Sequence, residues 1–334
     1  MKAIEVKKPG GLEHLTLTER TVSNPGPKQI QVRWKATSLN YHDYLVAVGT
    51  IPVDDGLVPM SDGAGEITEV GAEVTKWKVG DHVMSLFFPD WIDGKPTATN
   101  TAKLSGDNTD GFLIQTSCVD ESAVTSIPVG YSFAEAATLP CAGLTAWRGL
   151  MVEGKLQSGQ SVLIEGTGGM SIFALQIAKA AGAKVYATSS SEEKAAQLKE
   201  MGAEAVVNYR EDEKWGKTIA AMSDGGVDHV LDIGGGSTIS QSIEACVIGG
   251  HISAIGILGG GLKGQIHFPK LFFKHIKLQG IAVGSREMQE EMVASINTNK
   301  WKPIIDKSFS IEETADAFRY QESGAHFGKI VIEY

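Results

Sequence analysis

The segment SVLIEGTGGMSIFALQIAKAAGAKVYATS, residues 161–189, contains the most informative pattern of this chain. An apolar run leads into Gly166-Thr167-Gly168-Gly169-Met170-Ser171, a helical pattern follows, and a second apolar run closes the stretch. Strand, glycine-rich turn and helix in that order are the context of a dinucleotide-binding fingerprint. Glycine lets the backbone approach a pyrophosphate, and the helix N-terminus offers its free N–H groups. We therefore predict cofactor binding at residues 166–171.

The alternation of strands and helices continues beyond this stretch. Four more apolar runs follow, EAVVNY, DHVLDIG, HISAIGI and KLQGIAVG, with helical patterns or turn residues between them. Strands that alternate with helices predict a parallel, doubly wound sheet, and six strands complete a dinucleotide fold. The fold class is thus α/β, with a Rossmann domain expected over residues 127–284.

The first 126 residues follow a different pattern. Short strands punctuated by Gly and Pro are expected at KAIEVKK, QIQVRWKATS, GAGEITEVG, DHVMSLF and GFLIQTSCV, and residues 89–110 read as a long surface loop. A helix should begin near Ser132, which has capping-box spacing to Glu135. Two helices and a strand after residue 284 are expected to return to this mostly β domain, so that 285–334 complete 1–126.

Composition excludes several classes of protein. The 334 residues carry a net charge of −10 without a basic run, which argues against nucleic-acid binding. Three scattered cysteines suggest neither a disulfide framework nor a structural zinc site. No secretory signal and no apolar run of membrane length is visible. We expect a cytoplasmic protein that contacts neither membrane nor nucleic acid.

The end of the second strand bears on the choice between NAD and NADP. An acid there would accept from a ribose 2′-OH, but this chain has Ser189 and Ser190. Hydroxyls and cations suit a 2′-phosphate, and Lys194 and Tyr209 complete the predicted NADP site. Two alternatives stay open: Ser190 and Glu193 as helix caps, and Glu192 or Glu193 as the ribose acid. NAD(H) therefore remains possible.

Several motifs together resemble the medium-chain dehydrogenase/reductase superfamily over essentially the whole chain. They are GAGEITEVG followed by VGDHV, then GLTAW, GTGGMS, VGSR and FGKIVI. The most similar branch is the zinc-independent, quinone-oxidoreductase-like (alcohol-dehydrogenase-like) one. The resemblance implies a GroES-like catalytic domain, a substrate cleft between the domains, and a homodimer or homotetramer paired through the sixth Rossmann strand, with HISAIGILGGG in support.

The resemblance also locates where zinc would bind. The ligand positions of zinc-dependent members match Asn40, Ser61 and Cys141, and Asp62 stands where the motif has an acid. A catalytic zinc needs about three protein ligands beside an open position. An amide, a hydroxyl and one thiol do not meet that need, and residues 89–110 lack the cysteines of a structural lobe. We predict no metal.

The remaining site residues follow from the resemblance. Asn40 is the expected hydrogen-bond donor at the substrate oxygen, Tyr41 is a donor or pocket wall, and Asp43 fixes the loop or contacts the ribose. Tyr44 stands one residue from a tyrosine of quinone reductases. The cofactor contacts implied, beside residues 166–171, are Thr145, Asp232, Gly256, Ile257, Gly284, Ser285, Arg286, Phe327, Gly328 and Lys329. Alternatives stay open for several of these residues: Asp232 as a turn former, Arg286 in a salt bridge, Phe327 in the core, Lys329 as a solvated surface charge and Thr145 in helix packing.

These features predict a zinc-independent, NADPH-dependent oxidoreductase that transfers hydride to quinones or α,β-unsaturated carbonyl compounds. Conjugation spreads the charge that a metal would otherwise stabilise. A small electrophilic substrate is the expected partner. A zinc-free alcohol or aldehyde dehydrogenase is the alternative, with Tyr41, His42 and Tyr44 as relay candidates. An NADPH-binding redox sensor without turnover is an alternative of another class.

Overall fold

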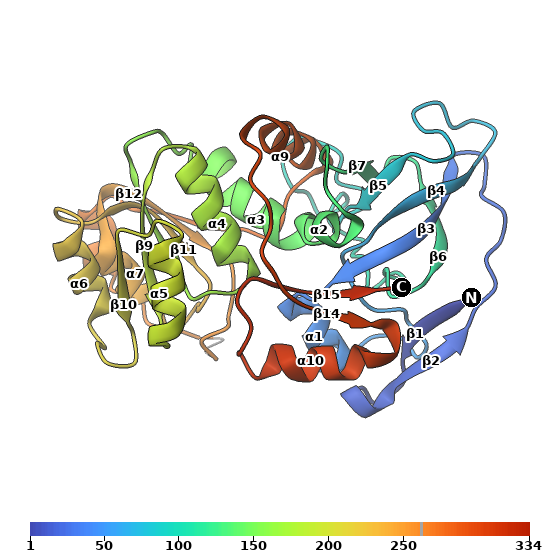
Figure 1. Ribbon diagram of the computed structural model, residues 1–334. Coiled ribbons are helices and arrows are strands. Elements are labelled where there is room, and N and C mark those ends of the chain that lie inside the picture. The colour runs from blue at the N-terminus through green and yellow to red at the C-terminus, as the bar shows by residue number, and fades with distance from the viewer. Residues whose placement is uncertain (261–262) are drawn as a thin grey trace. The chain divides into compact units, whose positions relative to one another are not determined.

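The fingerprint segment forms the strand, turn and helix that its pattern predicts. In the computed structural model, which describes residues 1–260 and 263–334, β8 (Ser161–Glu165) runs into Gly166. The helix α4 (Gly169–Ala180) follows (Figure 1). Gly166 has φ +71°, a left-handed value that favours glycine. The turn can therefore reverse the chain tightly before the helix begins.

The strand β8 lies inside a six-stranded parallel sheet with the order β10-β9-β8-β11-β12-β13. This is the order 3-2-1-4-5-6 of a doubly wound dinucleotide fold, so the predicted fold class is confirmed. The other strands are β9 (Lys184–Ser189), β10 (Ala205–Asn208), β11 (Val227–Asp232), β12 (Cys246–Ala254) and β13 (Lys277–Gly280). Their helices are α5 (Glu192–Glu200), α6 (Trp215–Met222), α7 (Ile239–Ala245) and α8 (Phe268–Phe273).

A second sheet carries the polar residues near Asn40. It has the strand order β14-β15-β3-β4-β5-β7, and β6 pairs with β3. The strands are β3 (Gln29–Ser38), β4 (Ala64–Val70), β5 (His82–Ser85), β6 (Thr116–Asp120), β7 (Val124–Ser126), β14 (Ile305–Ser310) and β15 (Lys329–Glu333). A hairpin of β1 (Lys2–Val6) and β2 (Leu15–Glu19) pairs separately. Trp34 and Ile67 are fully buried in the core beneath this sheet.

Helices and tight turns complete the mostly β part. The helices are α1 (Tyr41–Ala47), α2 (Phe133–Ala137), α9 (Arg286–Asn299) and α10 (Thr314–Glu322), with 3₁₀ turns at Leu12–His14 and Ile311–Glu313. Along the chain between α2 and β8, the short helix α3 (Leu144–Trp147) is flanked by π-helical turns at Leu139–Gly143 and Arg148–Glu153, and it leads out of the mostly β part. Ser132 caps α2 and exchanges hydrogen bonds with Glu135, which confirms the predicted capping box.

The chain divides into two units, and their bounds differ from the expected domains. Unit 1 comprises Met1–Leu144 and Val283–Tyr334, and unit 2 comprises Thr145–Ala282. We expected the first boundary after residue 126. The structure moves it later because Tyr131 donates to the Trp301 carbonyl and α2 packs on β3. The segment 127–144 therefore belongs to the discontinuous, mostly β unit.

Other expectations needed adjustment at their ends. The strand expected over 111–119 begins only at Thr116, because residues before it pair with β1, as in the Ala3–Ile114 bridge. The strands β2 and β14 were not expected from the sequence. Of HISAIGILGGG, Gly261 lies outside the described residues. Among the described residues, no helix has both the length and the apolar character needed to cross a bilayer.

Candidate active site

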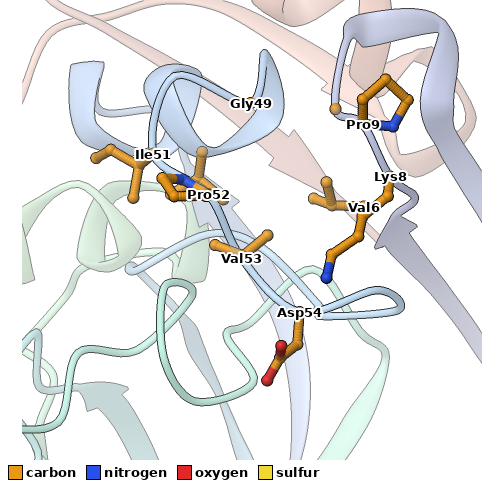
Figure 2. Close-up of a pocket in the computed structure, with 10 residues that line it drawn as sticks. Val6, Lys8, Pro9, Gly49, Ile51, Pro52, Val53 and Asp54 are labelled. Atoms are coloured by element: carbon orange, nitrogen blue, oxygen red, sulfur yellow. The ribbon is translucent and has the colours of Figure 1, made fainter.

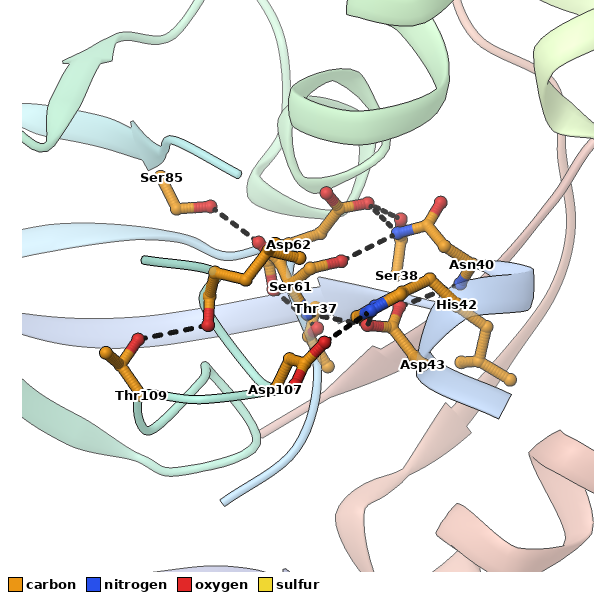
Figure 3. A network of polar contacts seen from close by, with 12 residues as sticks. Thr37, Ser38, Asn40, His42, Asp43, Ser61, Asp62, Ser85, Asp107 and Thr109 are labelled. Atoms are coloured by element: carbon orange, nitrogen blue, oxygen red, sulfur yellow. Dashed lines mark hydrogen bonds and ion pairs between the residues drawn. The ribbon is translucent and has the colours of Figure 1, made fainter. Parts of the chain in front are cut away.

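A buried polar network in unit 1 surrounds Asp62, just before β4 (Figure 3). Its carboxylate Oδ2 accepts hydrogen bonds from Ser38 Oγ at 2.7 Å and from Asn40 Nδ2 at 2.8 Å. The second amide hydrogen of Asn40 faces Ser61 Oγ at 3.3 Å. Thr37 Oγ1 donates to the Asp62 backbone carbonyl at 2.6 Å. The network therefore joins the end of β3 to the turn before β4.

Asp43 holds the two chain segments of this network together. Its Oδ2 accepts from the Asn40 backbone N–H and its Oδ1 from the Ser61 backbone N–H, both at 2.9 Å. The first of these bonds is part of a capping box that starts α1. Met60 precedes Ser61 with φ +80°, an unfavourable value for a bulky residue. Asp43 is fully buried, and its two contacts fix the loop at Asn40 against the segment at Ser61.

Lys329, at the start of β15, brings a positive charge into the same network. Its Nζ donates to the Leu39 carbonyl and to Asn40 Oδ1, both at 2.6 Å, and lies 3.8 Å from Asp62 Oδ2. The lysine is 3% exposed. We expected Lys329 at a cofactor phosphate and Asn40 as a donor to substrate. In the structure the amide groups of Asn40 are already engaged with Asp62, Ser61 and Lys329.

The pKa values of the buried acids follow from this arrangement. Burial raises the pKa of Asp62 to about 6, although the charge of Lys329 opposes the rise. Burial also raises the pKa of the Cys141 thiol well above its usual value, and Asp62 adds to the effect. Cys141 is therefore a neutral thiol near neutral pH.

These residues do not fit a catalytic zinc ion. Such a site needs about three protein ligands, and hydroxyl and amide groups are poor substitutes for thiolate, imidazole or carboxylate. Asp62 Oδ1 has no hydrogen-bond partner among the described residues. It and the Cys141 thiol are two potential ligands, one short of three. In the described part of the chain, no group of three or more His, Cys, Asp or Glu residues could hold a metal.

The aromatic and imidazole side chains of α1 differ in their surroundings. Tyr41 is 40% exposed. His42 Nε2 lies 3.0 Å from Asp107 Oδ2, and its Nδ1 lies 4.0 Å from Asp43 Oδ1 (Figure 3). Burial lowers the pKa of His42, but Asp43 and Asp107 outweigh burial and raise it. The Tyr44 hydroxyl donates to Glu322 at 2.6 Å, which raises the pKa of Tyr44 to about 12.

The predicted cofactor turn in unit 2 forms an open cradle. Gly168 caps α4, and a Cβ added to it would meet nothing within 4 Å. No side chain of the described residues caps this helix, so its first N–H groups are available to an anion. Ser171 Oγ donates to the Glu165 carbonyl at 2.7 Å. The hydroxyl thus packs the helix on β8 where the fingerprint has its third glycine.

The other residues of this turn differ in exposure. Thr167 is buried and Gly169 and Met170 are half-buried, so the turn presents mainly its backbone.

Loops after three neighbouring strands meet beside this cradle. The Leu258 N–H donates to the Ile233 carbonyl at 2.9 Å, which joins the loops after β11 and β12. A Cβ at Gly256 would lie 2.6 Å from the Ile233 oxygen, and Ile257 is 40% exposed. The structure therefore gathers Gly166, Gly256 and Ile257 at the carboxyl edge of the sheet, where ligands bind in such folds.

Asp232, for which we expected either a cofactor contact or a role in forming a turn, contacts groups of the turn that follows β11. It is fully buried, and its Oδ1 accepts from the Gly235 N–H and the Thr238 hydroxyl. The Ser242 hydroxyl bridges Asp232 and Glu165, at 2.6 and 2.8 Å. Burial, with the nearby Asp232, raises the pKa of Glu165 to about 8. Glu165 and Asp232 are both buried and accept hydrogen bonds from backbone N–H groups of residues 233–235, so they hold the loop after β11 rather than presenting a charge to a ligand.

The serines at the end of β9 lie beside Tyr209. The Tyr209 N–H donates to the Ser189 carbonyl at 3.2 Å, and Tyr209 is 42% exposed. The helix cap of α5 is Ser191, which accepts from the Lys194 N–H at 3.3 Å. The open alternative of Ser190 as the cap is therefore wrong. Ser190 is half-buried.

The remaining predicted contacts fall mainly in unit 1. Ser285 caps α9 and Arg286 pairs with Glu290 at 3.2 Å, while Arg286 Nη2 is buried without a partner among the described residues. Phe327 is buried and donates its N–H to Asp306. Gly328 has φ +87° and Gly284 packs on Leu144. Thr145 is buried at the start of unit 2.

An apolar pocket of about 240 Å³ lies elsewhere in unit 1 (Figure 2). Figure 2 shows Val6, Ile51, Pro52 and Val53 around it, with Lys8 and Asp54 among its lining residues. None of the predicted site residues lines it. Sequence reasoning missed a different feature, the pairing of Asp107 with His42, because Asp107 lies in a loop whose course no periodicity reveals.

Comparison with known proteins gives two family matches. Residues 26–129 match the model of the alcohol dehydrogenase GroES-like domain, and residues 169–298 match that of the zinc-binding dehydrogenase domain. A zinc-type alcohol dehydrogenase-like protein of Schizosaccharomyces pombe is 39% identical over 323 residues, which cover 93% of this chain and 91% of that protein.

Two further similarities extend over nearly all of both chains. A crystal structure described as that of an alcohol dehydrogenase from Sinorhizobium meliloti 1021 has 38% identity and a TM-score of 0.92, with 99% of this chain and 98% of that one covered. An acryloyl-coenzyme A reductase of Sulfurisphaera tokodaii is 27% identical, with 100% of each chain covered.

Proposed function

Because the chain belongs to the medium-chain dehydrogenase/reductase superfamily, zinc-type alcohol dehydrogenase-like, and is thereby an NAD(P)-dependent oxidoreductase, we propose a narrower activity for it. It is a zinc-independent, NADPH-dependent reductase of quinones or α,β-unsaturated carbonyl compounds. The observation that carries this proposal is the network of Asn40, Ser61 and Asp62, whose groups bond to one another and to Lys329 instead of forming a metal site.

Among the described residues, the network around Asp62 does not supply three suitable metal ligands, and this limits the kinds of substrate. When a simple carbonyl accepts hydride, negative charge builds on its oxygen, and a Lewis acid is the usual means to stabilise it. A quinone or an enone spreads that charge over a conjugated system, so hydrogen bonds suffice. Acryloyl groups are themselves conjugated, so the similarity to an acryloyl-coenzyme A reductase supports this substrate class.

Unit 2 supplies the groups that would hold the dinucleotide. When bound, NADPH supplies the hydride. The open backbone at Gly168 and the N–H groups of α4 suit the pyrophosphate. Ser190 and Tyr209 follow β9 and β10, where a 2′-phosphate would be held, and Lys194 belongs to the helix after β9. The Ser189 hydroxyl, which we expected to join them, is buried and donates to the Ser191 carbonyl at 3.2 Å. Hydroxyls and a cation favour the phosphate of NADPH over the bare ribose of NADH.

We propose His42 as the residue that provides the proton. Asp107 contacts its Nε2 and Asp43 lies near its Nδ1, and the two carboxylates favour the protonated ring. Tyr44 is less suited, because its hydroxyl is bonded to Glu322 and its pKa is raised to about 12. Tyr41 is exposed and suits a pocket wall. A proton held near the site completes the reduction after hydride arrives.

The test compares substrates and cofactors on the purified protein. We expect NADPH consumption with a quinone and an enone, little with a saturated aldehyde, and no loss of rate after treatment with a zinc chelator. Turnover confined to aldehydes and alcohols would favour the zinc-free dehydrogenase instead. Tight NADPH binding without consumption across the panel would favour a redox sensor. A higher kcat/KM with NADH would remove the NADP preference.

We also propose a homodimer or homotetramer in the cytoplasm, with no nucleic acid or membrane as partner. The strand β13 is an edge of its sheet. Nearby in sequence, Phe268, Phe272 and Phe273 are 63%, 57% and 72% exposed. Exposed aromatic groups of this kind favour burial against a second copy. Light scattering should show a dimer or tetramer at micromolar concentration, and a monomer would refute the assembly.

A further inference from the structure

Lys329 is a charged side chain in an unusually enclosed position. Its side chain is 4% exposed and that of Asp62 is fully buried. A buried charge is costly unless it is paired and hydrogen-bonded. Lys329 meets both conditions, since it donates to the Leu39 carbonyl and Asn40 Oδ1 and faces Asp62 at 3.8 Å. The ammonium is therefore an integral part of the network.

We propose that Lys329 is a built-in cation that takes the place of a catalytic metal ion in unit 1. This inference rests on the proposed zinc-free reaction and adds the residue responsible for it. One ammonium offsets the charge of Asp62 and occupies the carboxamide oxygen of Asn40. A divalent ion entering the same place would meet a like charge and an amide oxygen already in use.

Lys329 acts as a positioning residue. Because it holds Oδ1 of Asn40, it turns the amide hydrogens of Asn40 towards Asp62 and Ser61. A catalytic metal keeps an open position for a substrate oxygen, whereas this ammonium donates hydrogen bonds to the Leu39 carbonyl and to Asn40 Oδ1 of the protein itself. The chain thus keeps the positive charge of the site without a Lewis acid, which agrees with conjugated substrates.

Other charged groups near the network do not replace this cation. Asp43 is engaged by two backbone N–H groups, and the Cys141 thiol is neutral because its pKa is raised. His42 lies between Asp43 and Asp107. Lys329 is accordingly the cation whose removal should change both the stability and the metal affinity of the network.

The first test is a double-mutant cycle on thermal stability. Lys329→Gln leaves the buried Asp62 carboxylate uncompensated, so Tm should fall by several degrees. In Asp62→Asn the same lysine change should cost clearly less. Lys307→Gln, at an exposed lysine on β14 whose ammonium lies over the rings of Phe309 and Tyr320, is the control and should lower Tm less than Lys329→Gln. Equal losses from Lys329→Gln in both backgrounds would overturn the pairing.

The second test measures metal binding by spectroscopy. The variant Asn40→Cys/Ser61→His adds two zinc-type ligands to Cys141 and Asp62, and Co²⁺ binding is followed by its thiolate and visible absorption bands. With Lys329→Gln added, Co²⁺ affinity should rise at least tenfold over the same variant with Lys329. Equal affinity with and without Lys329 would overturn the inference, as would equal gain from Lys307→Gln.

The two levels of proposal fail differently in these experiments. One tightly held zinc per wild-type chain would refute the zinc-free reaction itself. The role of Lys329 alone would be refuted if the wild-type protein contained no metal, and if Lys329→Gln showed neither coupling to Asp62 in the Tm cycle nor an effect on Co²⁺ affinity. If the triple variant does not fold, the double-mutant cycle on the otherwise native chain still decides the question.

Discussion

Gly168→Ala should separate cofactor binding from folding. Gly168 has φ −72° and ψ 173°, values that alanine adopts easily, and an added Cβ would meet nothing within 4 Å. The fold should therefore be unchanged or stabilised by about 0.4–1 kcal/mol through the unfolded state. The methyl group would instead occupy the space that a pyrophosphate needs above the start of α4.

The expected loss of affinity follows from the hydrogen bonds at the helix end. Displacement that removes one N–H bond to a charged phosphate costs about 1.5–3 kcal/mol. This corresponds to a roughly 10- to 150-fold weaker Kd for NADPH. Calorimetric titration gives Kd, and thermal unfolding of the same samples shows whether stability is retained.

Two further variants calibrate the result. Gly280, at the end of the edge strand β13, also has open space around an added Cβ, so Gly280→Ala should leave Kd unchanged and affect Tm about as Gly168→Ala does. Gly166→Ala should lose stability, because φ is +71° there and the left-handed conformation costs about 1–2 kcal/mol. If Gly168→Ala bound NADPH as tightly as wild type, the pyrophosphate would not lie at this turn.

Three other changes test the remaining groups. In the folded chain Glu165 has a pKa of about 8, whereas its ordinary pKa in the unfolded chain is 4.5. Between these two pH values only the folded chain keeps the proton, so the contribution of Glu165 to the free energy of unfolding should fall by about 1.4 kcal/mol per pH unit as pH rises. Glu165→Gln should flatten this slope in denaturant titrations between pH 6 and 8, and an unchanged slope would contradict the assignment. Asp107→Asn should shift the alkaline limb of kcat/KM to lower pH, because the pKa of His42 loses one of the charges that raise it; a pH profile identical to wild type would exclude His42 as the proton donor. Ser132→Ala should lower the free energy of unfolding by about 1 kcal/mol through loss of the α2 cap, and urea denaturation with no change in midpoint would show that this cap contributes nothing.

The fold of unit 2 could be predicted because its signals are local. The sequence around Gly166–Ser171 contains both the strand and the helix of the fingerprint, and right-handed crossovers then constrain the strand order. The limit of unit 1 at Leu144 could not be predicted in the same way. It depends on contacts such as that of Tyr131 with Trp301, which are 170 residues apart in sequence.

The sequence singles out several residues of this network but not the partners that the structure gives them. Asn40, Ser61 and Asp62 could be singled out because a family motif marks their positions. The position of Lys329 could not be derived from that motif, since it arrives on a strand 289 residues after Asn40. The cap at Ser191 was displaced by one residue because three consecutive serines give nearly equal local signals.

The late arrival of β15 has a consequence during synthesis on the ribosome. Val331 pairs with Ser38 and Lys329 meets Asn40, so segments that are synthesised 289 residues apart share one sheet. Unit 2 is contiguous and can form before β15 has left the ribosome. Until β15 has been synthesised, Asp62 lacks its counter-charge, so a nascent chain that stops before β15 contains Asn40, Ser61 and Asp62 without the completed network.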